Sequence, residues 1–214
     1  MTSESDAALN LALFEIRVVR RRDFLRGGAG LAAGVLLPAT AAVAEVGKID
    51  PKPAAPVTDE DREFMTIALQ HMRQAGVLEK TGGPFGAVVV HHGKVLSVAG
   101  NSVMRDKDPS AHAEVNAIRE ACHKVGNPHI DGAVLYSSCE PCPMCYSIAF
   151  WARMSKIFYA ASWADYADLF DDANIAKDMS FPYEQRQVAM QQIMQPDAKK
   201  VWEEFRQLPD KARY

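Results

Sequence analysis

The spacing of apolar positions changes along the chain from a helical repeat to a strand repeat. After residue 57, apolar side chains recur every three or four positions, which predicts an amphipathic helix. Thr58 and Asp61 form the polar pattern that is typical of a helix start. The turn-forming run Gly82-Gly83-Pro84 should separate this helix from the next element. The apolar side of the helix comprises Phe64, Ile67, Ala68, Met72 and Ala75.

Short apolar runs with strand spacing come next. Residues 85–92 and 94–101 predict a β-hairpin that turns at His92-Gly93. Residues 133–138 and 157–161 predict two further strands. These strands are separated by helical patterns, and that alternation predicts an α/β fold built on a layered sheet.

The remaining elements are expected between and after these strands. Helices are predicted at residues 111–124 and 143–153. Residues 162–183 form an acidic stretch without a clear repeat, for which we expect an irregular segment. A fifth strand is predicted at residues 188–194 and a short helix at residues 201–208.

Two short motifs combine nitrogen, sulfur and carboxylate groups. His112-Ala113-Glu114 lies near the start of one predicted helix, and Pro141-Cys142-Pro143-Met144-Cys145 lies at the start of the next. One imidazole and two thiolates suit tetrahedral Zn²⁺, one ion per chain, and leave a fourth position for water. This pairing of H-x-E with P-C-x-x-C is the signature of zinc-dependent nucleobase deaminases. The predicted metal ligands are therefore His112, Cys142 and Cys145.

Glu114 is predicted to be a catalytic group and not a ligand. It lies two residues from His112, within reach of a zinc-bound water whose pKa the metal lowers to roughly 7. Deamination needs a proton carrier, because water loses a proton, a ring nitrogen gains one and the amine leaves as ammonia. Both motifs fall at helix N-termini, where the partial positive charge favours thiolates.

The cysteine spacing leaves other interpretations open. Cys139, Cys142 and Cys145 resemble part of an iron–sulfur cluster run, which needs a fourth thiolate. The remaining cysteine, Cys122, lies in an apolar helical pattern. A four-cysteine structural zinc site, a disulfide, or a non-catalytic metal or redox protein are further alternatives. None of these accounts for His112-Ala113-Glu114.

Residues 1–44 are predicted to be a twin-arginine export signal. Arg21-Arg22-Asp23-Phe24-Leu25 is followed by an uncharged run rich in Gly, Ala and Leu at residues 27–37. That run is too short for a transmembrane helix, which needs about 20 apolar residues. Ala42-Val43-Ala44 is an expected cleavage site. We therefore expect a periplasmic protein with no membrane anchor after cleavage.

The charge balance favours a small neutral substrate. The chain has 24 basic and 27 acidic side chains, of which residues 1–44 hold five and four, leaving 19 and 23. The mature chain thus has a net charge of −4 with neutral histidines. Polynucleotide binding depends on Lys and Arg against phosphate, so no nucleic-acid partner is expected. A proline-rich linker at residues 45–57 should precede one domain at residues 58–214.

Longer runs resemble the bacterial guanine deaminases of the cytidine-deaminase-like superfamily. These runs are residues 82–88 (GGPFGAV), 108–115 (DPSAHAEV), 136–145 (YSSCEPCPMC) and 150–153 (FWAR). The resemblance implies a three-layer α/β/α fold with a mixed five-stranded sheet. It also implies a homodimer in which the C-terminal segment is exchanged and caps the partner's site.

The resemblance also implies roles for individual residues. Glu114 would be the proton shuttle, and Asp172, rather than Asp171, would bind the leaving amino group, mainly in the other subunit's site. Asn101 would hydrogen-bond the purine ring, and Ala113 would offer a backbone contact. The flat slot for the ring would be lined or closed by Phe85, Trp151 and Tyr214.

The expected reaction is hydrolysis of guanine to xanthine and ammonia. The same site could take another aminated ring, such as a guanosine-type nucleoside, an aminotriazine or a pterin, because a few pocket contacts decide that choice. A tRNA adenosine deaminase shares the zinc signature and is a further alternative, although it needs a basic surface that this composition does not predict.

Overall fold

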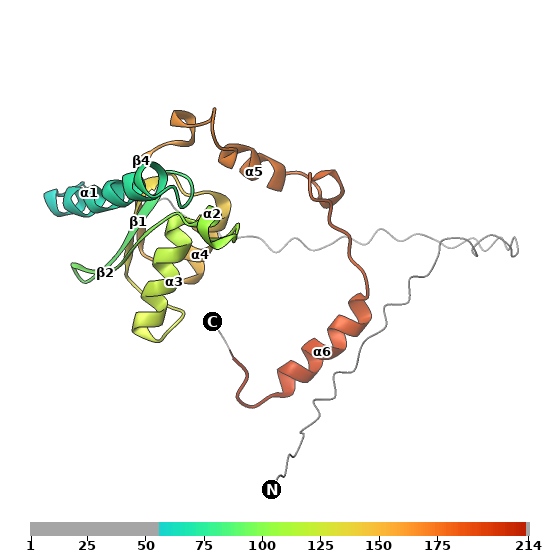
Figure 1. The fold of residues 1–214 in the computed structure, drawn as a ribbon. Helices are drawn as coiled ribbons and strands as arrows, with labels where there is room; N and C mark the ends of the chain where they lie inside the picture. The colour runs from blue at the N-terminus through green and yellow to red at the C-terminus, as the bar shows by residue number, and fades with distance from the viewer. Residues whose placement is uncertain (1–55, 213–214) are drawn as a thin grey trace, which may run out of the picture. The chain divides into compact units, whose positions relative to one another are not determined.

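The computed structural model describes residues 56–212 of the chain (Figure 1). The predicted export signal, most of the predicted linker and Tyr214 lie outside the described residues. Within residues 56–212, no helix has the length and apolar character that a membrane span requires.

A mixed sheet of four strands, in the order β2-β1-β3-β4, forms the centre of the described fold. β1 pairs antiparallel with both β2 and β3, and β3 pairs parallel with β4. His92 and Gly93, which join β1 to β2, both have positive φ, as a tight hairpin turn requires. The predicted hairpin is thus confirmed. The strands span Gly86–His91 (β1), Lys94–Gly100 (β2), Val134–Cys139 (β3) and Lys156–Ala161 (β4).

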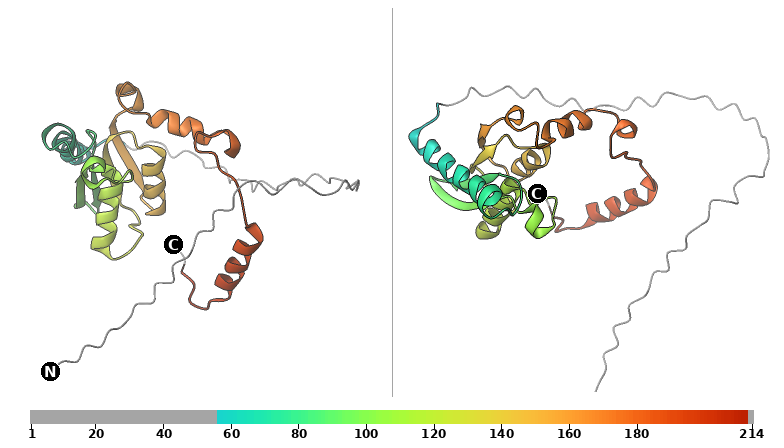
Figure 2. Two further views of the ribbon diagram at one scale, coloured as in Figure 1. Left: turned by 45° about the vertical axis from the view of Figure 1, so that its right-hand side comes forward. Right: turned by 45° about the horizontal axis from the view of Figure 1, so that its top comes forward.

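Helices cover both faces of this sheet, which gives the expected three-layer α/β/α arrangement (Figures 1 and 2). Val88, Val90 and Tyr136 pack on the face that carries helix α1 (Asp59–Arg73). Ala87, Val89 and Leu135 point to the opposite face, against α3 (Ala113–Val125) and α4 (Pro143–Trp151). The two apolar sets alternate along the strands because successive side chains of a strand point to opposite faces.

The start of α1 is determined by its first residues. The Thr58 hydroxyl accepts a hydrogen bond from the Asp61 backbone N–H at 3.1 Å, and the Asp61 carboxylate accepts one from the Thr58 backbone at 2.8 Å. This reciprocal capping box satisfies two N–H groups that the helix cannot pair internally. The helical turns then continue beyond α1 as a π-helix at Gln74–Leu78.

The prediction of a fifth strand at residues 188–194 is wrong. The segment has no regular secondary structure, and β4 is an edge strand in the described part of the chain. Val188 and Ile193 are 79% and 74% exposed, so no apolar face of the segment packs on the sheet. Gln191-Gln192 interrupts the apolar positions, which removes the two-residue repeat that a half-buried strand needs.

Three helices depart from the sequence prediction. The short helix α2 (Val103–Asp106) comes directly after β2 in a region for which no helix was predicted. Helix α5 (Asp172–Met179) lies within the segment expected to be irregular. Helix α6 (Gln195–Gln207) begins before the predicted residue 201, because Pro196 and Asp197 in its first turn suit a helix start. None of the residues of α6 is buried.

Candidate active site

The three predicted metal ligands come together where two helices begin. His112 is the N-cap of α3, Cys142 is the N-cap of α4, and Cys145 lies in the first turn of α4. The His112 Nδ1 atom is 3.7 Å from Cys142 Sγ and 3.5 Å from Cys145 Sγ. The two sulfur atoms are 3.6 Å apart.

These separations fit a tetrahedral zinc ion. Typical Zn–S and Zn–N bond lengths place two ligand sulfurs about 3.8 Å apart, and a nitrogen and a sulfur about 3.6 Å apart. No other group of this kind occurs among residues 56–212, and Cys139, buried at the end of β3, is not part of it. The spatial arrangement therefore favours a three-ligand site with an open position over a four-cysteine or iron–sulfur site.

The pKa values of the three ligand groups shift in different directions, and the shift of Cys142 favours the thiolate that a metal binds. A hydrogen bond from Cys145 and the nearby His112 lower the pKa of Cys142 to about 4, although burial opposes this change. The hydrogen bond to Cys142, followed by burial, raises the pKa of Cys145. The hydrogen bond with Cys142 likewise raises the pKa of His112. Metal binding displaces the protons that the free ligand groups carry, because zinc binds thiolates and neutral imidazole.

Glu114 occupies the first turn of α3 and is buried. Burial raises the pKa of its carboxyl group, and a hydrogen bond from the Ser137 hydroxyl partly offsets that rise. The Ser137 Oγ atom lies 3.0 Å from Glu114 Oε1. A buried carboxyl group with a raised pKa can both accept and return a proton near neutral pH.

A cavity of about 250 Å³ joins the metal ligands to the predicted substrate-binding residues. Its volume is below the roughly 300–1,000 Å³ of sites for drug-sized molecules, so it suits one small ring system. Its lining includes His112, Cys142 and Glu114 together with Phe85, Asn101 and Asp172.

Asn101 comes directly after β2 and is buried. Its Oδ1 atom accepts a hydrogen bond from the Val103 backbone N–H at 3.1 Å. Its backbone carbonyl accepts one from the Thr81 hydroxyl at 2.7 Å, and its backbone N–H donates to the Phe85 carbonyl at 3.0 Å. The side-chain amide also has an NH₂ group that can donate to a bound ring.

Asp172, in the first turn of α5, lines the cavity, whereas Asp171 is exposed. The Tyr166 hydroxyl donates a hydrogen bond to Asp172 Oδ2 at 3.2 Å. Burial raises the pKa of Asp172, and the neighbouring Cys142 adds to this rise. Of the two aspartates, only Asp172 lines the cavity. In the single chain, Asp172 lines the same cavity as Glu114 and the metal ligands His112 and Cys142.

The remaining predicted residues differ in their placement. Phe85 contacts Phe170 edge-on at a centroid distance of 4.9 Å, and the two rings form one wall of the cavity. Ala113 is fully buried between His112 and Glu114 at the start of α3. Trp151 is 57% exposed at the end of α4 and is not among the residues that line this cavity in the single chain. Its position results from the turn of α4, which directs Cys145 and Ala149 inward.

Sequence reasoning missed several residues at this site. Tyr166 and Phe170 come from the stretch expected to be irregular, and Ser137 comes from a strand with no chemical motif. Glu140 lines the cavity, and its backbone carbonyl accepts a hydrogen bond from the Trp163 indole at 3.0 Å. Glu140 could have been predicted from the sequence, because it directly precedes the Pro141-Cys142 motif. Contacts between distant segments position the others, and spacing does not reveal such contacts.

The fold and the geometry of the metal-ligand group indicate a zinc-dependent hydrolytic deaminase. Residues 58–161 match the family described as the cytidine and deoxycytidylate deaminase zinc-binding region. The chain is 41% identical over 140 residues to the guanine deaminase of Bacillus subtilis strain 168, a match that covers 65% of this chain and 90% of that protein. The chain therefore belongs to this deaminase family, and His112, Cys142 and Cys145 form a possible zinc site within it.

Two further comparisons define the similarity. The crystal structure of the Bacillus subtilis guanine deaminase superimposes with a TM-score of 0.69 and 38% identity, covering 72% of this chain and 98% of that chain. A tRNA-specific adenosine deaminase of Aquifex aeolicus is 40% identical over 98 residues, which cover 46% of this chain and 64% of that protein. The similarity to the guanine deaminase thus extends over much more of the chain.

Proposed function

We propose that this protein hydrolyses guanine to xanthine and ammonia. The observation that carries the proposal is the cavity in which the possible zinc ligands meet Glu114, Asn101 and Asp172. The similarity to a guanine deaminase over nearly the full length of that relative supports this substrate.

The residues of the chain divide the work of the reaction. Zinc, when held by His112, Cys142 and Cys145, supplies a Lewis acid that lowers the pKa of water to roughly 7. Hydrolysis adds the oxygen of water to the ring carbon that bears the amino group and breaks the C–N bond. Glu114 accepts a proton from water and passes it to the adjacent ring nitrogen, and it transfers the second proton to the amino group, which leaves as ammonia.

Asn101 and Asp172 orient the ring for this step. The NH₂ group of Asn101 donates to an acceptor on the purine edge, and its oxygen accepts from the Val103 backbone N–H. Asp172 accepts a hydrogen bond from the amino group of the substrate, and Tyr166 holds its carboxylate in place. The rings of Phe85 and Phe170 cover the apolar side of the purine.

An ammonia-release assay on the purified zinc-loaded chain tests the substrate. Guanine should release ammonia with a higher kcat/KM than a guanosine-type nucleoside, an aminotriazine or a pterin. A tRNA anticodon stem-loop is included because of the similarity to a tRNA-specific adenosine deaminase. Higher kcat/KM on any of these than on guanine would replace the proposed substrate, and no ammonia from any of them would refute the proposed activity.

We propose further that the protein works as a homodimer with exchanged C-terminal segments. Trp202 and Val201 of α6 are 58% and 63% exposed in the single chain, although both are large apolar residues. A groove of about 660 Å³ at α4 and β4 is lined by aromatic side chains, among them Tyr146, Phe150 and Tyr159. A second copy would bury both surfaces, since monomers rarely expose large contiguous apolar patches. In this arrangement Tyr214 would close the partner's site.

For the localisation, we propose export to the periplasm by the twin-arginine route. The support is the run from Arg21 to Leu25, the apolar segment after it and Ala42-Val43-Ala44. In a bacterial host, the periplasmic form should begin at Glu45, as N-terminal sequencing would show. Replacing Arg21 and Arg22 with lysine should leave the protein in the cytoplasm with residues 1–44 attached. Equal export of the lysine variant would contradict the proposal.

A further inference from the structure

We infer that Asn116 is a positioning residue. It holds Asn101, the proposed substrate-binding residue, in place relative to the metal ligand His112. Asn116 lies on α3, one turn beyond the N-cap residue His112, and its backbone N–H donates to the His112 carbonyl at 2.9 Å. Its side chain does not line the 250 Å³ cavity and therefore acts through other residues. The inference rests on the proposed role of Asn101 in binding the purine.

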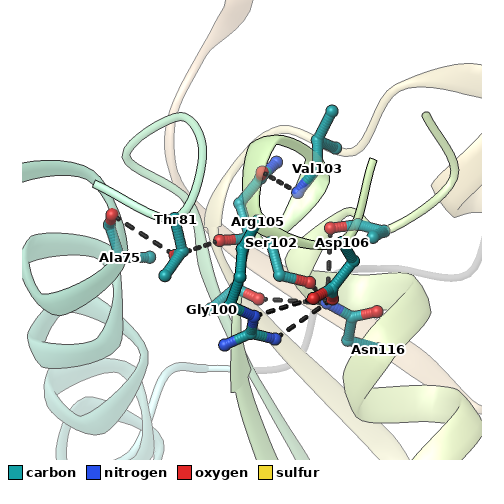
Figure 3. A network of polar contacts seen from close by, with 10 residues as sticks. Ala75, Thr81, Gly100, Ser102, Val103, Arg105, Asp106 and Asn116 are labelled. Carbon is teal, nitrogen blue, oxygen red and sulfur yellow. Dashed lines mark hydrogen bonds and ion pairs between the residues drawn. The ribbon is translucent and has the colours of Figure 1, made fainter. Parts of the chain in front are cut away.

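The side-chain amide of Asn116 connects three segments (Figure 3). Its Nδ2 atom donates to the Gly100 carbonyl at 3.2 Å, to the Ser102 hydroxyl oxygen at 2.9 Å and to the Ala111 carbonyl at 3.3 Å. Gly100 and Ser102 directly flank Asn101 in the chain. Ala111 directly precedes His112. One amide group thus fixes both neighbours of the proposed purine-binding residue and one neighbour of a metal ligand.

The surroundings of Ser102 determine which way the Asn116 amide faces. The Ser102 backbone N–H donates to the Ala111 carbonyl at 3.0 Å, which joins the same segments a second time. The Ser102 carbonyl in turn accepts a hydrogen bond from the Asp106 backbone N–H at 2.8 Å, which fixes the backbone of Ser102 at the start of α2. With the backbone held in this way, the Ser102 hydroxyl oxygen accepts from Asn116 Nδ2. All three partners of Asn116 Nδ2 are acceptors, so only the NH₂ end of the amide fits there.

The hydrogen bonds of Asn116 affect the substrate site through Asn101. Asn101 lines the 250 Å³ cavity on one side, and with Ser102 and Asn116 it also lines a polar groove of about 750 Å³ on the other. Asn101 and Ser102 are both buried, at 4% and 2% exposure, so they lack room to compensate for a lost partner. Removal of the amide should therefore shift Asn101 and weaken binding of the ring.

Ser97 provides a matched control. Its hydroxyl donates to the Ala117 carbonyl at 2.6 Å and therefore also connects β2 to α3. Ser97 is buried, but it flanks neither Asn101 nor His112. Ser97→Ala removes a β2–α3 hydrogen bond and leaves in place the bonds of Asn116 to Gly100, Ser102 and Ala111. A merely structural role for Asn116 would give the two alanine variants the same behaviour.

The experiment compares Asn116→Ala, Asn116→Asp and Ser97→Ala in the full zinc-loaded chain. We expect Asn116→Ala to raise the KM for guanine about 10-fold, the scale of one lost hydrogen bond, with zinc content retained. Asn116→Asp keeps the shape but presents a carboxylate to three oxygen acceptors, and it should raise KM further. Ser97→Ala should lower Tm and leave KM unchanged.

Two double variants separate positioning from other effects. In a Glu114→Gln background, which we expect to lack turnover, calorimetry should show about 10-fold weaker guanine binding when Asn116 is also replaced by alanine. In an Asn101→Ala background, Asn116→Ala should raise KM no further, because its effect passes through Asn101.

The outcomes distinguish this inference from the proposed function. If Asn101→Ala raises KM but Asn116→Ala does not, Asn116 is structural and the inference fails alone. If Asn101→Ala leaves KM unchanged, the proposed role of Asn101 fails and the inference fails with it. Full additivity of the two alanine substitutions would also overturn the positioning role, because independent residues add.

Discussion

Ser137 and Glu114 are joined by a hydrogen bond of 3.0 Å in which the serine hydroxyl donates to a carboxylate oxygen. Both side chains are buried, and they come from different layers, Ser137 from β3 and Glu114 from α3. Burial raises the pKa of Glu114, while the bond from Ser137 holds one oxygen in a fixed position. A buried carboxyl group held in this way suits the proton-shuttle role that we propose for Glu114.

Glu114→Gln should retain zinc and lose nearly all turnover. Glutamine preserves the shape and the contact with Ser137, but it cannot accept and return a proton, which contributes about 10²–10⁴ in rate. The measurements are zinc content by elemental analysis and kcat for ammonia release. Glu120→Gln, on the exposed side of the same helix, is the control and should keep full activity. Near-normal kcat in zinc-loaded Glu114→Gln would refute the assignment.

Cys142→Ala and Cys145→Ala should each lose the metal, whereas Cys139→Ala should keep it. The sulfur atoms of Cys142 and Cys145 are both in the ligand group, but that of Cys139 is not. Elemental analysis should find one zinc per chain in the wild-type protein and in Cys139→Ala, and little in the other two. Thermal melting of the two ligand variants should also begin at a lower temperature, because metal binding stabilises the folded state. Zinc loss in Cys139→Ala would point to a site with a third thiolate.

Gly82→Ala should weaken guanine binding without loss of zinc. A Cβ atom at Gly82 would overlap the Oδ1 atom of Asn101, whose amide the Val103 N–H holds in place. The φ angle of Gly82 lies outside the left-handed region, so alanine fits its backbone and the effect comes from that overlap. We expect KM to rise about 10-fold, as for one lost hydrogen bond. An unchanged KM would show that the amide of Asn101 does not need its present position.

The metal ligands and Glu114 could be predicted from the sequence because each motif is local. His112 and Glu114 belong to one three-residue motif, and Cys142 and Cys145 belong to one four-residue motif. A helix start fixes the geometry of each pair. The hairpin at His92-Gly93 could be predicted for the same reason, since a two-residue turn dictates the pairing of its strands.

The support around the site could not be predicted from spacing. Asn116 and Gly100 are 16 residues apart in the sequence, and Ser137 and Glu114 are 23 residues apart. Their contacts therefore form only when the layers of the fold pack together. The predicted strand at residues 188–194 was wrong because a local pattern was present but its long-range partner was not. Its composition allowed a strand, but a strand also needs a neighbour on the sheet, and the single chain leaves the segment exposed.

Asp61→Asn should destabilise the fold at neutral pH and have little effect in acid. The Asp61 carboxylate accepts from the Tyr136 hydroxyl at 2.6 Å and caps α1 through Thr58, and the Tyr136 bond is the main cause of its lowered pKa. A lowered folded-state pKa gives stability above the unfolded value of about 3.9, and this stability is lost as the pH falls through the folded value.

Chemical unfolding of both proteins at several pH values measures this effect. The difference in unfolding free energy should be on the order of 1 kcal/mol at pH 7, the scale of a helix cap, and should shrink below pH 4. Asp59→Asn is the control, since Asp59 lies in the same turn and is exposed. A difference that stays constant down to pH 2 would show that the charge of Asp61 is not the cause.

Subunit mixing tests the proposed exchange of C-terminal segments. Chains with Glu114→Gln have an intact tail but no proton carrier, and chains truncated after Leu208 have Glu114 but lack Tyr214. Each should be inactive as a homodimer if the tail must close a site. In a mixed dimer with exchange, the intact tail of the first chain closes the site of the second, so one site has both parts. Unfolding and refolding the two together should therefore restore part of the wild-type kcat. Two affinity tags identify the mixed dimers, and their complete inactivity would mean that each tail serves its own chain.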